Sequence, residues 1–305
     1  MNKKQIFQGV STALITPFKN GEIDYDALGC LIEYQIDANI DALVIGGTTA
    51  EISTLSTEER YRLYAFAKEK IDGRTRLILG TGTNDTRATL YNSKFAEGVG
   101  CDGLLLVTPY YNKGTEFGIE KHYLSIAESV DLPIIVYNVP SRTGVNLKIS
   151  LLERLANHPN IVGIKEASDS ADRLVSLALL TDKLSLYAGN DSQIYPVLAL
   201  GGEGVISVIS NILPKEVKAL CNSYFDNDSK QSLNIQLKLL PLIKALFIET
   251  NPAPVKYAMS LLGLCSAELR LPLCEPKDST KKEIERALRL IKSQSETDNK
   301  LLDSI

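Results

Sequence analysis

The sequence predicts an α/β protein built as a closed (β/α)8 TIM barrel, followed by a C-terminal extension of about three helices. Short β-branched or apolar runs alternate with stretches of helical period from Val10 to Tyr224, which is enough for eight units. Several runs, such as Leu104–Val107 and Ile134–Val136, are continuously apolar, as is typical of parallel strands buried on both faces. After Tyr224 only helical patterns follow.

The expected strands are Val10–Leu14, Ala42–Gly46, Arg76–Gly80, Gly103–Val107, Pro133–Tyr137, Ile161–Lys165, Leu184–Ala188 and Gly204–Ser207. The expected helices between them are Ser56–Ile71, Asp85–Glu97, Thr115–Ser129, Lys148–Asn157, Asp169–Leu180 and Pro214–Tyr224. The first of these helices opens with Ser-Thr-Glu-Glu, which has the form of a capping box. A doubly wound open sheet is the alternative arrangement. Its dinucleotide-binding form is disfavoured, because no G-x-G-x-x-G turn follows the first strand.

The C-terminal extension is expected to contain the helices Ser229–Phe247, Pro254–Leu262 and Lys277–Lys292. The polar, turn-prone segment Asp226–Ser229 marks its beginning. We therefore expect a catalytic barrel over residues 1–226 and a helical extension over residues 227–305. The last residues, Ser293–Ile305, are expected to form a loosely held polar tail.

Composition and charge favour a cytoplasmic protein that acts on a small molecule. Thirty-three basic and 37 acidic residues give a net charge of −4 without a basic cluster, so no nucleic-acid partner is expected. No apolar run approaches the roughly 20 residues that span a bilayer, and the polar N-terminus lacks the apolar core of a signal peptide, so no membrane association is expected. Five scattered cysteines without a C-x-x-C pair indicate reduced thiols.

Lys165 is the most informative candidate for a reactive group. It ends the apolar run Ile161–Ile164, and barrel enzymes place their reactive groups at the carboxyl ends of strands. A lysine paired with a carboxylate at the barrel mouth is one interpretation. The other is an amine nucleophile, because burial can lower the pKa of a lysine from about 10.4 toward roughly 7–8 and a neutral amine forms an imine with a ketone.

An imine stabilises an adjacent carbanion without a metal or cofactor, and we expect neither, because no set of metal ligands is visible in the sequence. The two histidines, His122 and His158, fall in a helix and a loop on the helical side of the barrel and are interpreted as structural. Proton transfer at the imine would then depend on hydroxyl groups.

Other polar side chains follow the carboxyl ends of neighbouring strands. Tyr137 is either a strand-end aromatic or a phenol that shuttles protons near the imine. Thr48 and Thr49 follow a Gly-Gly turn. They are either polar turn residues without a role in binding, or they supply hydroxyl and N–H donors to a small carboxylate. Arg142 is either a solvated loop charge or a bidentate clamp for a carboxylate. Their expected position on one rim of the barrel favours the functional interpretations.

Four motifs together resemble the pyruvate-dependent class I aldolases, the superfamily of N-acetylneuraminate lyase. They are Gly47–Glu51, Tyr110–Asn112, Tyr137–Gly144 and Gly163–Ser168. Within that superfamily the chain is most similar to the dihydrodipicolinate synthase family, with a likeness from Gly9 to Leu290 that includes Gly201–Ser207 and Phe247–Lys256. The resemblance implies a Schiff-base condensation of pyruvate with L-aspartate 4-semialdehyde that gives 4-hydroxy-tetrahydrodipicolinate, on the route to lysine and diaminopimelate.

Carried over to this chain, the resemblance implies four catalytic residues. Lys165 would form the imine, and Tyr137 would relay protons through Thr48 to Tyr111. In the family this last tyrosine reaches the site of the neighbouring subunit. The resemblance therefore implies an oligomer, which we expect to be a homotetramer arranged as a dimer of tight dimers.

The resemblance also implies four substrate-binding residues. Thr49 would hold the carboxylate of pyruvate, and Arg142 would bind the carboxylate of the semialdehyde at the mouth of the pocket. Gly189 and Ile206 would shape the pocket floor.

Three alternatives share part of this pattern. N-acetylneuraminate lyase has the same lysine and tyrosine, but it typically carries Ser-Thr in place of Thr48-Thr49 and lacks the arginine found here at position 142. A sugar-acid aldolase, such as a keto-deoxygluconate aldolase, is a second alternative. A catalytically inactive barrel with a binding or regulatory role is a third, and the complete set of Lys165, Tyr137, Thr48 and Tyr111 disfavours it.

The chain departs from the family pattern at two positions. Ala50 stands where the family usually has glycine, which would cost about 1 kcal/mol if the position needed positive φ. Ala88 stands where lysine-inhibited relatives carry a glutamate that binds the amine of the effector. Losing such a contact, worth about 1.5–3 kcal/mol, predicts weak or absent feedback inhibition by lysine.

Overall fold

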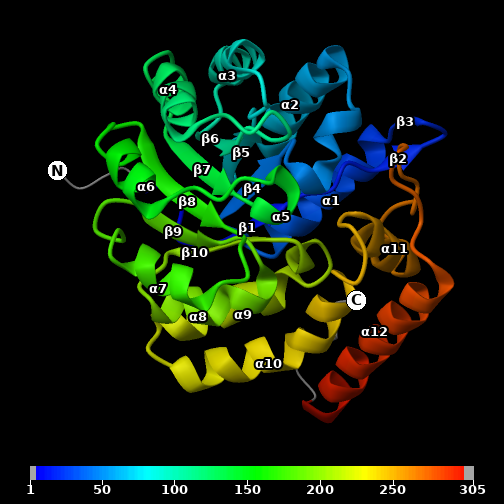
Figure 1. The fold of residues 1–305 in the computed structure, drawn as a ribbon. Helices are drawn as coiled ribbons and strands as arrows, with labels where there is room; N and C mark the ends of the chain where they lie inside the picture. Colours follow the sequence, from blue (N-terminus) through cyan, green and yellow to red (C-terminus); the bar gives the residue numbers. More distant parts are fainter. Residues whose placement is uncertain (1–4, 299–305) are drawn as a thin grey trace.

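The computed structural model describes residues 5–298, and eight parallel strands in this part of the chain close into a barrel. The strands are β1 (Gly9–Ala13), β4 (Ala42–Ile45), β5 (Arg76–Gly80), β6 (Gly103–Val107), β7 (Ile134–Asn138), β8 (Ile161–Glu166), β9 (Ser185–Ala188) and β10 (Gly204–Ser207). Each strand pairs with its neighbours along the chain, and β1 closes the ring by pairing with both β4 and β10 (Figure 1). The predicted (β/α)8 barrel is confirmed, and each expected strand lies within one residue of an observed one.

Helices follow the strands and cover the outside of the barrel (Figure 1). They are α1 (Tyr25–Asp37), α2 (Thr57–Ile71), α3 (Thr86–Val99), α4 (Glu116–Ala127), α6 (Ile149–Leu155), α7 (Ala171–Ala178), α8 (Ile194–Ala199) and α9 (Pro214–Phe225). A further short helix, α5 (Pro140–Thr143), lies in the loop after β7 and lines the cavity at the carboxyl ends of the strands. The predicted capping box of α2 is confirmed: the Ser56 hydroxyl accepts from the Glu59 N–H, and the Glu59 carboxylate accepts from the Ser56 N–H.

The sequence prediction missed α1, α8, the four-residue helix α5 and a short hairpin of β2 (Phe18–Lys19) and β3 (Glu22–Ile23). Helix α1 contains Gly29, which lowers helix propensity, but Asp24 caps its first turn and the side chains of Leu28 and Leu31 are buried. Helix α8 has only six residues and contains Pro196 in its first turn, a place where proline is tolerated. In both helices packing outweighs the weak local signal.

The hydrophobic core has two parts separated by the sheet. The strands are buried on both faces, as their continuous apolar sequences predicted. Side chains that point into the barrel form an inner cluster, which includes Val44, Ile78, Tyr137 and Ile206. Those that point outward pack against the helices in a larger cluster. Because the inner cluster fills the barrel, a polar side chain at its upper end is held on a rigid, packed base.

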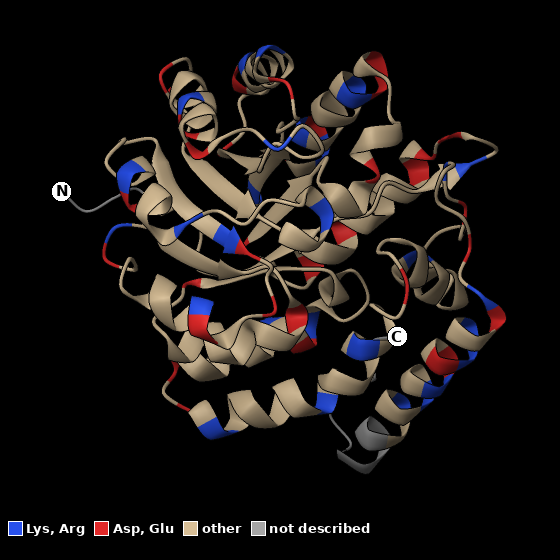
Figure 2. Ribbon diagram, viewed as in Figure 1, with Lys and Arg blue, Asp and Glu red and all other residues tan. Residues whose placement is uncertain are grey.

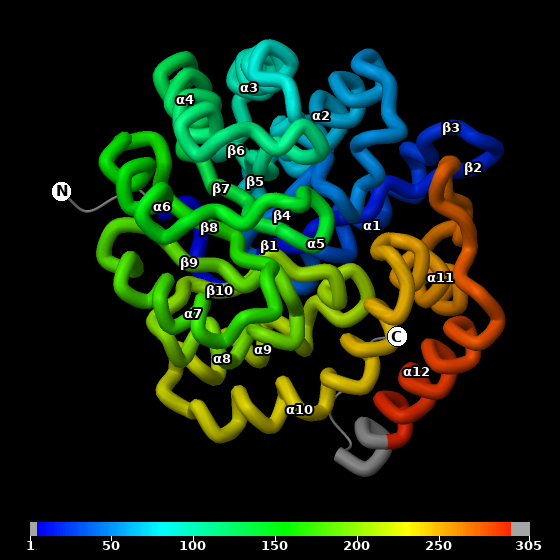
Figure 3. Tube along the Cα trace, viewed as in Figure 1, coloured from blue at the N-terminus to red at the C-terminus, as the bar shows by residue number. Residues whose placement is uncertain are grey.

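The C-terminal extension consists of α10 (Ser229–Ala245), α11 (Ala253–Leu261) and α12 (Asp278–Asp298). Helix α10 packs against α9 and α12, and α11 packs against α12. In Figures 1 and 3 the extension occupies the lower and right-hand part of the molecule. The turn between α9 and α10, where Asp228 caps α10, contains the boundary expected at residue 226. The division into a barrel over residues 1–226 and an extension over residues 227–305 stays a prediction.

One expectation about the extension is wrong. Ser293–Asp298 was expected to belong to a loose tail, but α12 continues through these residues. They contain no glycine or proline that would end a helix. The remainder of the expected tail lies outside the described residues.

Charged residues of both signs are spread over the fold. Figure 2 shows Lys and Arg interspersed with Asp and Glu around the ring of helices. Within residues 5–298, none of the helices has both the length and the apolar composition needed to cross a membrane. The same part of the chain contains no cluster of three or more His, Cys, Asp or Glu side chains that could hold a metal ion.

Candidate active site

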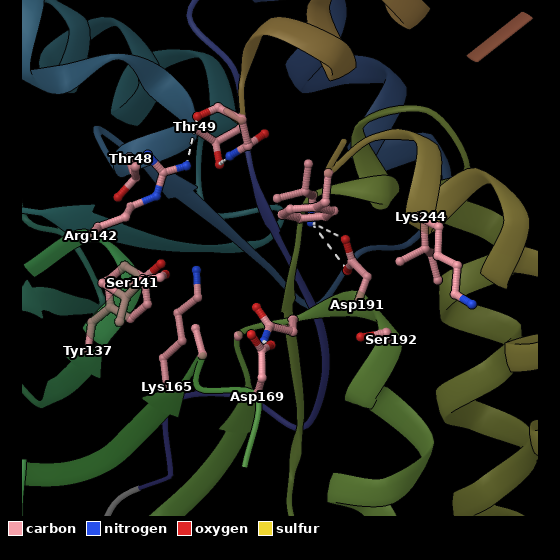
Figure 4. Close-up of a pocket in the computed structure, with 18 residues that line it drawn as sticks. Thr48, Thr49, Tyr137, Ser141, Arg142, Lys165, Asp169, Asp191, Ser192 and Lys244 are labelled. Carbon is pink, nitrogen blue, oxygen red and sulfur yellow. Dashed lines mark hydrogen bonds between the residues drawn. The ribbon is translucent and has the colours of Figure 1, made fainter. Parts of the chain in front are cut away.

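A cavity of about 510 Å³ opens at the carboxyl ends of the strands. Its wall is built from the loops that follow β4, β7, β8, β9 and β10, together with α10 and the loop after it (Figure 4). The residues that line it are Thr48, Thr49, Tyr137, Val139, Ser141, Arg142, Lys165, Ala167, Asp169, Gly189, Asn190, Asp191, Ser192, Val208, Ile243, Lys244, Phe247 and Asn251. Six of the eight residues expected to form the site therefore line one cavity.

Lys165 projects from β8 into this cavity (Figure 4). Its side chain is only 5% exposed, and burial lowers the pKa of its amine to about 7. Asp191 opposes this shift and Arg142 adds to it through their charges. No carboxylate of the described residues lies within ion-pair distance of the Lys165 Nζ atom. The geometry supports the nucleophile interpretation over the ion-pair interpretation, because an unpaired, desolvated amine with a pKa of about 7 has a large neutral fraction near pH 7.

The neighbouring carboxylate of Glu166 is engaged elsewhere. Successive side chains of a strand point to opposite faces, so Glu166 points away from the cavity. Its oxygens accept hydrogen bonds from Arg173 Nε at 2.8 Å, Asn138 Nδ2 at 2.9 Å and the Ser168 N–H at 2.9 Å. Glu166 thus fixes the end of β8 without neutralising the charge of Lys165.

Tyr137 lies beside Lys165 on the neighbouring strand. The two residues are partners in the register of β7 and β8, and the Lys165 Nζ atom lies 4.3 Å from the centroid of the tyrosine ring. Burial raises the pKa of the Tyr137 phenol, while Arg142 and the Thr48 side chain act in the opposite direction. The phenol is therefore protonated at neutral pH, and it lies close enough to Thr48 for that side chain to influence its pKa.

Thr48 and Thr49 lie in a 3-10 helix (Thr48–Ala50) that follows β4. The first N–H groups of a helix have no partner within it and point outward as donors. The Thr49 hydroxyl accepts a hydrogen bond from Asn251 Nδ2 at 2.9 Å. Ala50 is not in the left-handed region; the residue with positive φ is Glu51, at 54°. The substitution at position 50 therefore does not strain this turn.

Arg142 extends from the short helix α5 over the cavity (Figure 4). Its Nη2 atom donates a hydrogen bond to the backbone carbonyl of Asn251 at 2.8 Å. This contact leaves the other donors of the guanidinium group available to a ligand. It also connects the loop after β7 to the C-terminal extension.

Asp191 is a site residue that the sequence analysis did not assign. It follows β9, is only 1% exposed, and its Oδ2 atom accepts from the N–H groups of Val208 and Ile209 at 3.1 and 2.9 Å. Burial raises the pKa of its carboxyl, whereas Ser207, the two N–H groups and Lys165 lower it. Its position in the Gly-Asn-Asp segment at the end of a strand was visible in the sequence, but its electrostatic influence on Lys165 was not.

Of the other expected residues, Gly189 lines the cavity and Tyr111 and Ile206 do not. A Cβ atom on Gly189 would lie 2.6 Å from Ala167 Cβ and 2.7 Å from the Glu166 carbonyl, so only glycine fits. Ile206 is completely buried in the inner cluster that supports the cavity. Tyr111 is 87% exposed, with φ at 72°, on the loop after β6. Within one chain this tyrosine does not reach Thr48.

The histidines lie outside the cavity, in agreement with their structural interpretation. His122 is buried in α4, where its Nδ1 atom shares a hydrogen bond with the Thr86 hydroxyl at 2.9 Å. Burial lowers the pKa of His122 to about 4. His158 is half-buried in the turn before β8.

Comparison with known proteins assigns the family. Residues 6–291 match the dihydrodipicolinate synthetase family. The chain belongs to this family. Over 285 residues it is 45% identical to a 4-hydroxy-tetrahydrodipicolinate synthase of Endomicrobium trichonymphae, a match that covers 93% of this chain and 98% of that protein. The resemblance inferred from the four motifs is confirmed.

Solved structures of family members have the same fold. The dihydrodipicolinate synthase of Thermotoga maritima superposes with a TM-score of 0.92 at 43% identity, covering 94% of this chain and 99% of that one. The 4-hydroxy-tetrahydrodipicolinate synthase of Methylacidiphilum fumariolicum SolV superposes with a TM-score of 0.94 at 41% identity, covering 96% and 99%. Both neighbours therefore share the fold of this chain over nearly its whole length.

Proposed function

We propose that the chain is a lyase that condenses pyruvate with L-aspartate 4-semialdehyde to give 4-hydroxy-tetrahydrodipicolinate, on the route to lysine and diaminopimelate. The observation that carries the proposal is the buried amine of Lys165, whose pKa of about 7 leaves a large fraction of it neutral at physiological pH, beside a protonated phenol. Family membership and relatives named 4-hydroxy-tetrahydrodipicolinate synthase support this reaction over that of N-acetylneuraminate lyase.

The first step forms an imine between enzyme and pyruvate. The lone pair of Lys165 Nζ attacks the keto carbon of pyruvate, and the carbonyl oxygen leaves as water after it has gained two protons. The Thr49 hydroxyl and the N–H groups of the 3-10 helix are the donors for the pyruvate carboxylate. The Tyr137 phenol supplies and recovers protons at the nitrogen and oxygen, because it lies beside the amine and close to the Thr48 side chain.

The second step forms the carbon–carbon bond. Loss of a methyl proton converts the protonated imine to an enamine, whose terminal carbon attacks the aldehyde carbon of the semialdehyde. The aldehyde oxygen takes a proton and becomes the hydroxyl group of the product. The amino group of the semialdehyde then attacks the imine carbon, which closes the ring and releases the Lys165 amine. Arg142 would hold the carboxylate of the semialdehyde at the mouth.

The proton relay is proposed to include a second subunit. Tyr111 is exposed and does not line the cavity of its own chain, so its phenol is available to a neighbouring molecule. We propose that it reaches Thr48 of that molecule in a tight dimer, and that two such dimers form a homotetramer. We also propose that the enzyme is cytoplasmic and acts on its two small-molecule substrates without a cofactor, a metal, a nucleic acid or a membrane.

Borohydride reduction in the presence of pyruvate tests the proposal. Intact mass and peptide mapping should locate one reduced pyruvate adduct per chain on Lys165, and Lys165→Ala should carry none. An unmodified native protein would rule out the Schiff-base mechanism. If the adduct forms, aspartate semialdehyde and N-acetylneuraminate are compared as substrates. Turnover of N-acetylneuraminate alone would replace the synthase assignment with that of a sugar-acid lyase.

A further inference from the structure

The C-terminal extension contributes one buried polar side chain to the wall of the cavity, that of Asn251 in the loop between α10 and α11. Asn251 is only 5% exposed. Its Nδ2 atom donates to the Thr49 hydroxyl at 2.9 Å, and its backbone carbonyl accepts from Arg142 at 2.8 Å. One residue of the extension therefore contacts both of the groups proposed to bind substrate carboxylates.

The direction of the bond to Thr49 decides what the threonine can do. A hydroxyl has one proton to donate and two lone pairs that accept. The amide nitrogen of Asn251 only donates, so the Thr49 oxygen is the acceptor of this bond. The hydroxyl proton is thereby left for another acceptor, and a carboxylate oxygen in the cavity is an acceptor that fits. Asn251 also fixes the rotation of the Thr49 side chain, because the oxygen must face the amide.

A second contact holds the extension against the same turn. The Lys256 ammonium lies 2.6 Å from the carboxylate of Glu51, and both side chains are completely buried. The other oxygen of Glu51 accepts from the Arg270 N–H at 3.1 Å. Glu51 is the residue with positive φ that ends the 3-10 helix of Thr48 and Thr49. The extension therefore contacts this turn through both Lys256 and the Arg270 N–H, and these contacts hold Asn251 close to Thr49.

We infer that Asn251 is a positioning residue for the pyruvate carboxylate: it orients the Thr49 hydroxyl so that the proton faces the substrate. The inference rests on the proposed function, and it assigns a role in substrate binding to the C-terminal extension. It concerns the Asn251 side chain alone, since the bond to Arg142 uses the backbone carbonyl and survives substitution.

Two substitutions test the inference through separate KM values for the two substrates. Asn251→Ala removes the donor, and the KM for pyruvate should rise about tenfold, with a change of less than about threefold in the KM for the semialdehyde. Asn251→Asp is nearly isosteric but only accepts, so it would draw the hydroxyl proton away from pyruvate and add a negative charge. Its KM for pyruvate should rise more, by about a hundredfold.

Asn160→Ala is the matched control for a structural loss. The Asn160 side chain donates to the carbonyls of Ala127 and Val130 at 3.0 and 2.7 Å, just before β8 and so at the opposite end of the barrel. Its removal should lower the melting temperature and leave both KM values unchanged. If Asn251→Ala behaves in the same way, the inference is wrong.

A double-mutant cycle with Thr49→Val, which removes the hydroxyl, tests whether Asn251 acts through Thr49. The effect of Asn251→Ala on the KM for pyruvate should vanish in the Thr49→Val background, and additive effects would overturn the inference. Failure of the proposed function would be seen separately, because the native protein would then form no adduct with pyruvate. If only this inference fails, the native protein still forms the adduct.

Discussion

The Lys165 amine lies over the face of the Tyr137 ring, 4.3 Å from its centroid, at the same level of the barrel. The face of an aromatic ring attracts an ammonium group by about 2 kcal/mol when water is excluded. The fall of the lysine pKa from 10.5 to about 7 corresponds to about 5 kcal/mol in the opposite direction. The effect of burial on the lysine pKa is therefore larger than that of the ring, and a large fraction of the amine is neutral at physiological pH.

Adduct formation should depend on pH with a midpoint near the pKa of Lys165, about 7. Below that pH the amine is protonated and has no lone pair, so the rate of imine formation falls; above it the rate levels off. The measurement is the rate of borohydride trapping with pyruvate well below saturation, which reports the free enzyme, between about pH 5.5 and about pH 9. A rate that is independent of pH over this interval would contradict a titrating amine.

Replacing the buried amine should stabilise the fold. The folded pKa of Lys165 is lower than its unfolded value, so the unfolded chain binds more protons between about pH 7 and pH 10.5 and stability rises with pH there. Lys165→Met removes this cost and should raise the free energy of unfolding by about 1–4 kcal/mol at pH 6, with a smaller gain at pH 10. Urea unfolding at both pH values measures it. A variant that is less stable than the native protein at pH 6 contradicts the prediction.

Arg142→Ala should affect the second substrate more than the first. The KM for the semialdehyde should rise by about ten- to a hundredfold, because a charge-assisted contact to its carboxylate is lost, while the KM for pyruvate changes little. The positive charge of Arg142 also lowers the pKa of Lys165, so the midpoint of adduct formation should move to higher pH. Arg142→Lys, which keeps the charge, should restore the midpoint. Equal effects on both KM values would argue against the clamp.

Tyr111→Phe tests the proposed contribution of a neighbouring subunit. The ring is retained and only the hydroxyl is lost, so the oligomer should persist while turnover falls by about a hundredfold, the usual effect of removing a proton-transfer group. Steady-state kinetics and sedimentation are measured on the same sample. Full turnover in an intact oligomer would remove Tyr111 from the relay.

Feedback inhibition by lysine should be weak or absent. Ala88 is half-buried in α3 and offers no carboxylate to the amine of an effector, so a charge-assisted contact is missing there. Ala88→Glu should increase sensitivity to lysine if an effector site exists at this position. Activity is followed in a coupled assay with increasing lysine. Inhibition of the native protein at micromolar lysine would contradict the prediction.

The barrel and the group of residues at its rim could be predicted from the sequence. Continuous apolar runs identify parallel strands, and the carboxyl ends of parallel strands meet at one rim of the barrel. The sequence alone therefore predicts that Lys165, Tyr137, Thr48 and Arg142 lie close together, and all four line the cavity. Helix α1 and the last turns of α12 were missed or misjudged because a glycine and a polar composition weaken the local signal.

The sequence by itself determined the strands, the rim on which they end and the family to which the chain belongs, because these depend on local periodicity and short motifs. Only the tertiary structure decided that Lys165 is unpaired and buried, that Asp191 acts on its charge, and that Asn251 of the extension donates to Thr49. Burial and hydrogen bonding depend on every segment packed around a group, and here those segments lie far apart along the chain.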